Sequence, residues 1–257
     1  HWGAAGAAAA TVISQLVSGA GLCVYTLFRM PEFRPARRNC RIQKQILTEI
    51  SRFSFLTCVQ QSVMNLGILM VQGLVNSFGT VVMAAFAAAV KIDSFAYMPV
   101  QDFGNAFSTF IAQNYGAGKR LRIQEGIKSA AKTSVLFCLA ISFAVWIFAE
   151  KLMLIFVQPQ ETEILAVGVG YLRIEGAFYW GIGCLFLLYG LYRAVRMPGM
   201  SVALTVISLG TRVALAYVLS SIPSVGLVGI WAAVPIGWIL ADLTGLLYYW
   251  RKDIAFK

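Results

Sequence analysis

Long uncharged stretches run along the chain and alternate with shorter segments rich in Lys and Arg. Charged side chains are absent from 2 to 28 and again from 53 to 90. Such runs predict membrane spans, because a helix needs about 20 apolar residues to cross the hydrocarbon core. The second run is long enough for two crossings, and turn-forming residues at 76–80 divide it. We predict an all-α, polytopic membrane helix bundle with seven spans, at 2–28, 53–75, 81–115, 133–149, 164–190, 199–220 and 226–250.

Composition supports a membrane class. Hydrophobic residues make up 59% of the 257 residues and charged residues 12%, with a mean hydropathy of +0.73, whereas soluble domains carry about a quarter charged residues. His1 is the single histidine, and the five cysteines show no CxxC spacing, so we expect no metal site, no cofactor and no enzyme. The opening shows no signal peptide and begins inside an apolar segment without Met, so we expect a truncated chain.

Basic residues gather in alternate connections: 29–52, 116–132, the segment after the fifth span and the segment after the seventh. Because cytoplasmic loops carry the excess of Lys and Arg, we predict an outside N-terminus and a cytoplasmic C-terminus. A nucleic-acid surface is the rival interpretation of the +10 charge. The basic residues are spread among four loops without interleaved aromatic residues, so we expect no nucleic-acid partner.

The basic segment 29–52 has two parts. Two prolines break its front, while Ile42, Ile46, Leu47 and Ile50 have helical spacing beside charged residues. A short amphipathic helix on the inner leaflet fits this pattern, and a solvated linker fits it equally well.

Seven charged residues fall within the predicted spans. Five lie near mid-depth: Lys91, Asp93, Arg173, Glu175 and Arg212. Asp102 and Asp242 fall in the half nearer the cytoplasm. A mid-membrane charge facing lipid costs about 3 kcal/mol, so these side chains should face a bundle interior or a wet cavity and pair there.

Uncharged polar residues mark the second and third spans. Gln61, Asn65, Gln72 and Asn76 share one helical face, and the third span adds Tyr97, Gln101 and Asn105, with Pro99 expected to kink it. Two neighbouring polar helices suggest a solute path. Polar residues also hold membrane helices together, and both interpretations stay open for the second span. For the third, we favour the path.

A mid-depth carboxyl group is a natural coupling group, because it can change its charge as a cavity opens to one side or the other. That property is what proton or sodium antiport requires. The alternative for Glu175 and Arg212 is a static interior ion pair.

Six segments along the chain carry a family pattern: GAAGAAAATVISQ (3–15), VNSFG (75–79), AAFAAAVKID (84–93), STFIAQNYGAGK (108–119), YLRIE (171–175) and GLYR (190–193). On these segments the whole chain resembles the multidrug and toxic compound extrusion (MATE) family. They follow that family's order from the sixth to the tenth helix.

This resemblance implies twelve helices in two lobes that rock, with cation export driven by protons or sodium. It implies that 1–28 is the last helix of the first lobe, 29–52 a cytoplasmic interlobe loop, 53–250 the second six-helix lobe and 251–257 a cytoplasmic tail. Some members carry carboxylates where this chain has 58–61 and 181–186, which hold none here. Sodium coupling of that type is therefore in doubt, and Asp93 and Glu175 become the expected coupling residues.

We thus predict a plasma-membrane antiporter whose partners are the bilayer, a small organic cation and a first lobe missing from this chain. The cavity residues we expect are Gln61, Asn65, Gln72, Lys91, Tyr97, Gln101, Asp102, Asn105, Arg173 and Arg212. Tyr97, Tyr179 and Trp180 could stack on a cation, although core packing also explains each of them. The alternatives are an exporter of lipid-linked oligosaccharide and, more distantly, a seven-helix receptor.

Overall fold

The computed structural model describes residues 3–31 and 43–252, and no strand occurs among them. Two compact units are present, His1–Ser51 and Arg52–Lys257. Helix α1 (Gly3–Arg29) belongs to the first unit and has 27 residues, or roughly 40 Å at 1.5 Å per residue. That length suffices to cross a membrane, as predicted for residues 2–28.

Helix α2 (Lys44–Asn76) is one continuous helix of 33 residues. The amphipathic helix that we predicted within 29–52 is therefore not a separate surface element from Lys44 onward. No Gly or Pro interrupts the chain between Lys44 and the span, so the helical hydrogen bonding continues into it. Residues 32–42, which include Ile42 and several of the expected basic residues, lie outside the described residues.

A three-residue turn separates α2 from α3 (Thr80–Gly116) and confirms the division predicted at 76–80. Gly79 has φ 101°, a left-handed conformation that glycine adopts without the steric cost of a Cβ. Helix α3 runs without interruption through Pro99 and is followed by α4 (Arg120–Met153).

We predicted a single helix at 164–190, and this is wrong. The chain forms two helices there, α5 (Thr162–Gly176) and α6 (Tyr179–Ala194). The two helices meet at 51°. The N–H of Phe178 donates to the carbonyl of Glu175 at 3.0 Å, which closes a turn between them. Six described helices are long and apolar enough to cross a membrane, and this pair makes a seventh candidate if it forms one broken span.

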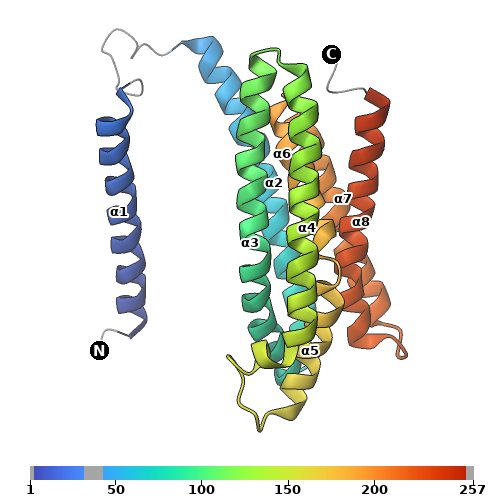
Figure 1. The fold of residues 1–257 in the computed structure, drawn as a ribbon. Helices are drawn as coiled ribbons and strands as arrows, with labels where there is room; N and C mark the ends of the chain where they lie inside the picture. The colour runs from blue at the N-terminus through green and yellow to red at the C-terminus, as the bar shows by residue number, and fades with distance from the viewer. Residues whose placement is uncertain (1–2, 32–42, 253–257) are drawn as a thin grey trace. The chain divides into compact units, whose positions relative to one another are not determined.

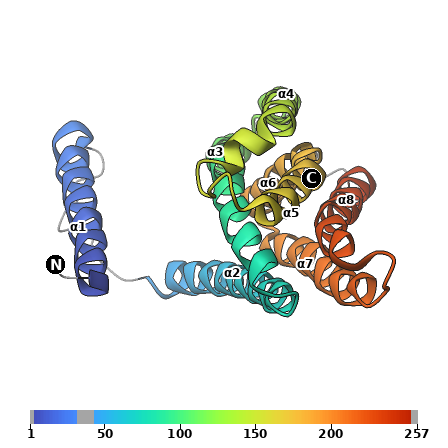
Figure 2. The ribbon, with the colours of Figure 1, turned by 90° about the horizontal axis from the view of Figure 1, so that it is seen from below.

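Helix α6 lies at the centre of the second unit, in contact with α3, α4, α7 (Pro198–Ser220) and α8 (Gly226–Lys252). Figure 2 shows α3 and α4 on one side of it and α7 and α8 on the other. The arrangement of the helices along their length can be followed in Figure 1. A Cβ at Gly190 would stand 2.6 Å from the carbonyl oxygen of Gly104, so glycine is what lets α3 and α6 approach so closely.

Candidate ion-coupling site

Two buried carboxyl groups from different helices meet inside the second unit. Asp93 of α3 and Glu175 of α5 are each 5% exposed and lie within hydrogen-bonding reach of each other. The hydroxyl of Tyr179, at the start of α6, donates to Oδ1 of Asp93, and Tyr171 of α5 interacts with both carboxyl groups. We call these four residues, together with Arg212, the carboxyl cluster.

The break between α5 and α6 explains this convergence. Tyr171 and Glu175 are four residues apart in α5, which places them on one side of that helix. Helix α5 ends at Gly176 and the chain turns there, so Tyr179 begins a new helix while staying beside Asp93.

Aromatic rings close one side of the carboxyl cluster. The ring of Tyr171 packs edge-on against Phe86 of α3, with centroids 5.5 Å apart, and against Trp231 of α8, at 4.8 Å. Phe86 and Trp231 are themselves stacked at 5.5 Å. These contacts fix the Tyr171 ring and keep this side apolar, which strengthens electrostatic interactions inside the cluster.

Of the three predicted cationic partners, one faces the carboxyl groups. Arg212 of α7 lies close enough to act electrostatically on both Asp93 and Glu175. Lys91 is exposed, and Arg173 is exposed over the ring of Trp146 at 5.6 Å. Lys91 and Arg173 therefore do not face the interior of this lobe, and a wet cavity stays the prediction for both. Lys91 is two residues from Asp93, and a helix turns about 200° over that distance.

Within the described residues, Oε2 of Glu175 and Nε of Arg212 are buried and have no hydrogen-bond partner. Buried polar atoms are nearly always paired. Oε2 of Glu175 is therefore free to accept a proton or a hydrogen bond. Nε of Arg212 is free to donate to an acceptor that a side-chain movement brings near.

The remaining predicted cavity residues do not join the carboxyl cluster. Most are exposed on the surface of α2 or α3: Gln61, Asn65, Gln72, Asp102 and Asn105. Tyr97 and Gln101 are half-buried on α3. Asn105 accepts a hydrogen bond from Nη2 of Arg193 at 2.9 Å, which ties the exposed face of α3 to the end of α6.

Three residues of the lobe interior were not among the predicted site residues. Tyr171 had a signal in the sequence, its four-residue spacing from Glu175. Gln60 is buried and donates from Nε2 to Oγ1 of Thr205 at 3.0 Å, whereas its predicted neighbour Gln61 is exposed. Asp242 is also buried, and its position within a span was its signal.

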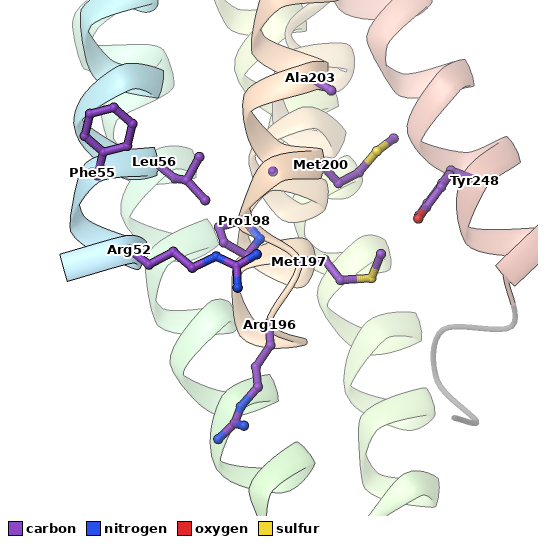
Figure 3. A pocket seen from close by; sticks show the side chains of 10 residues that line it. Arg52, Phe55, Leu56, Arg196, Met197, Pro198, Met200, Ala203 and Tyr248 are labelled. Carbon is purple, nitrogen blue, oxygen red and sulfur yellow. The ribbon is translucent and has the colours of Figure 1, made fainter. Parts of the chain in front are cut away.

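A cavity of about 550 Å³ lies elsewhere, between α2, the start of α7 and α8. Figure 3 shows the side chains that line it, among them Arg52 of α2, Met197 and Met200 near the start of α7, and Tyr248 of α8. None of the residues that line it belongs to the predicted site.

Known proteins resemble this chain along its length. The chain is 27% identical over 256 residues to the "Probable multidrug resistance protein NorM" of Thermotoga maritima, covering 97% of this chain and 54% of that protein. It is 26% identical over 261 residues to the "Probable multidrug resistance protein YoeA" of Bacillus subtilis (strain 168), covering 96% and 54%. The chain thus spans about half the length of these curated relatives.

Solved structures share the fold. An outward-facing multidrug resistance MATE family transporter of the MOP superfamily superposes with a TM-score of 0.87 at 22% identity, covering 98% of this chain and 56% of that one. A MOP superfamily transporter from Pyrococcus furiosus, described as having a binding pocket of reverse polarity, gives 0.88 at 21%, covering 98% and 57%. The MatE family model matches residues 54–218. The chain therefore belongs to the MatE family of membrane transporters.

Proposed function

We propose that this chain is the second lobe, with the last helix of the first, of an antiporter that exports organic, cationic, amphipathic solutes in exchange for protons or sodium. The observation that carries the proposal is the buried pair of Asp93 and Glu175 beside a single cation, Arg212. The family membership and the multidrug resistance relatives support the same function.

Charge balance gives the carboxyl cluster its coupling role. With one proton on the two carboxyl groups, the remaining carboxylate offsets Arg212 and the cluster is neutral. After that proton leaves, the cluster carries one net negative charge in an apolar setting and attracts a cation. The proton and the cation therefore favour opposite states of the lobe, as an antiporter requires.

The exposed polar faces of α2 and α3 supply the cavity wall in this proposal. Polar side chains facing lipid are costly, so Gln61, Asn65, Gln72 and Asp102 belong opposite a first lobe that completes the cavity. Lys91, which is also exposed on α3, puts a positive charge on this wall as well. That charge favours a second candidate, the export of an anionic lipid-linked substrate.

The topology follows from the same proposal. The broken pair of α5 and α6 counts as one span, which makes seven. The connections rich in Lys and Arg face the cytoplasm of a cell whose plasma membrane holds the protein.

The test uses the complete transporter that contains this chain, reconstituted in liposomes. Efflux of a fluorescent organic cation is followed under an imposed proton gradient and, separately, a sodium gradient. We expect gradient-driven efflux that falls to the level of empty liposomes in Asp93→Asn and in Glu175→Gln. Glu163→Gln is the matched control, because Glu163 is an exposed carboxylate in the first turn of α5.

Either of two results would overturn the proposal. Efflux that is driven equally well in all variants would leave the two carboxyl groups as structural residues. The absence of cation efflux under both gradients would favour the lipid-linked substrate.

A further inference from the structure

A second polar layer crosses the lobe interior and links three helices. Oγ1 of Thr205 accepts from Nε2 of Gln60 at 3.0 Å and donates to the carbonyl of Ser201 at 2.9 Å. Oγ of Ser201 donates to the carbonyl of Tyr189 at 3.1 Å. All four residues are buried. A hydrogen-bonded layer thus runs from α2 through α7 to α6.

Asp242 of α8 lies beside this layer and is only 5% exposed. Among the described residues, neither of its carboxyl oxygens has a hydrogen-bond partner. The carboxyl group faces α6, since a Cβ on Gly181 would stand 3.8 Å from its Oδ2. The thiol of Cys184 and the hydroxyl of Tyr189, both on α6, are within its electrostatic reach.

The groups around Asp242 offer it no counter-charge. Cys184 and Tyr189 are the titratable side chains that face it from α6, and α7 contributes hydroxyl groups such as Thr205 and Ser208 to this interior. Arg212 of α7 also packs against α8, beside Gly237, but it belongs to the carboxyl cluster and does not act on Asp242. Helix α5 meets α8 through the rings of Tyr171 and Trp231. No Lys, Arg, His or other carboxyl group of the described chain acts on Asp242. An ionised carboxylate without a partner is costly here, whereas a carboxyl group that holds a proton is neutral.

We propose that Asp242 is a second proton-binding site of the lobe, separate from the carboxyl cluster. The carboxylate takes a proton from hydronium, which forms the O–H bond and leaves water, and it returns the proton to water when the lobe opens. The site binds its proton whether or not the transported solute is a cation.

The cavity between α2, α7 and α8 marks the side from which this interior is reached. Leu56 and Met197 line it, and each lies one helical turn before a member of the polar layer, Gln60 and Ser201 respectively. In the view of Figure 3, Met197 lies between Leu56 of α2 and Tyr248 of α8. The layer ends at Tyr189, which is within electrostatic reach of Asp242, so its hydroxyl and amide groups can pass hydrogen bonds to a water molecule that enters from the cavity.

The test is infrared difference spectroscopy of the complete transporter while the pH is stepped across its stable range. The carboxyl C=O stretch reports protonated acids directly. Asp242→Asn is compared with the wild type, with Asp242→Glu as the conservative variant and with the double variant Asp93→Asn/Glu175→Gln. Glu125→Gln, at an exposed position of α4, is the control.

We expect a protonated-carboxyl band that disappears reversibly as the pH rises. It should be lost in Asp242→Asn, shifted in Asp242→Glu, and retained in the double variant and in the control. A spectrum of Asp242→Asn identical to that of the wild type would overturn the assignment. So would a band that persists at every pH, which marks a permanently neutral acid, or a band removed by sodium at constant pH. The measurement needs no transport, so its failure is distinct from a failure of the efflux test.

Discussion

Charged residues are buried on one face of α3 and exposed on the other. On the inner face, Asp93 is buried, receives a hydrogen bond from Tyr179 and lies beside Glu175 and Arg212. On the opposite face, Lys91 and Asp102 are exposed, three turns apart on one line. The charge on the inner face is buried inside the lobe, whereas the charges on the outer face are available to a partner that packs against the lobe.

This difference separates two roles that a polar residue can have in a membrane helix. A buried carboxyl group has few charged neighbours and little water around it, so a single proton changes the electrostatic free energy of its surroundings strongly. An exposed polar residue affects the affinity for a bound solute or partner, and it contributes little to the stability of the lobe. We therefore expect inner substitutions to affect folding and coupling, and outer substitutions to affect solute binding.

The largest expected effect is on the contact that holds the inner face in place. Gly190→Val should destabilise the lobe by about 3 kcal/mol, because the added Cβ meets the carbonyl of Gly104 on α3. Thermal unfolding of the purified transporter measures this loss. Gly73→Ala on α2 is the control, since nothing lies within 4 Å of its added Cβ, and its stability should change by less than about 0.5 kcal/mol. Equal effects at both positions would contradict the packing described for α3 and α6.

A smaller effect is expected from removing one hydroxyl of the carboxyl cluster. Tyr179→Phe deletes the donor to Asp93 and should cost about 1–3 kcal/mol, because a buried carboxyl oxygen loses its partner. The efflux rate should then depend on pH differently from the wild type. Tyr217→Phe, at an exposed position of α7, should change neither property. An unchanged pH profile in Tyr179→Phe would remove Tyr179 from the coupling site.

The smallest effect distinguishes two adjacent glutamines of α2. Gln60→Leu breaks the hydrogen bond to Thr205 and should lower stability by about 1 kcal/mol. Gln61→Leu should leave stability unchanged and raise the KM for the exported cation. Unfolding curves and efflux kinetics on the two variants measure the contrast. A loss of stability in Gln61→Leu with normal KM would contradict the placement of the cavity wall.

Much of the helical layout followed from the sequence alone, because membrane spans are set by long uncharged runs and by turn residues such as Gly79. The break after Gly176 did not follow from it. Hydropathy reports the composition of a span, whereas the bend reflects the packing of α5 and α6 against their neighbours. One example is Gly176, where an added Cβ would stand 3.1 Å from Val145 of α4.

The charged members of the carboxyl cluster could be predicted from the sequence, but their pairing could be predicted only in part. The cost of burying charge pointed to Asp93 and Glu175, and the four-residue spacing from Glu175 would have added Tyr171. The choice of Arg212 over Lys91 and Arg173 depends on how α7 packs in the lobe. Tertiary packing of this kind leaves no periodic signal in the sequence.

Exchange of a proton for a cation is the central claim, and proton release on cation binding tests it most directly. The purified transporter is mixed with an organic cation in weakly buffered solution, and a pH-sensitive dye reports the protons released. We expect about one proton per cation bound in the wild type, because ligands that favour opposite states displace each other. Asp93→Asn and Glu175→Gln should release none. A wild type that binds the cation without releasing protons, or variants that release as many as the wild type, would contradict the proposal that the carboxyl cluster couples proton movement to export.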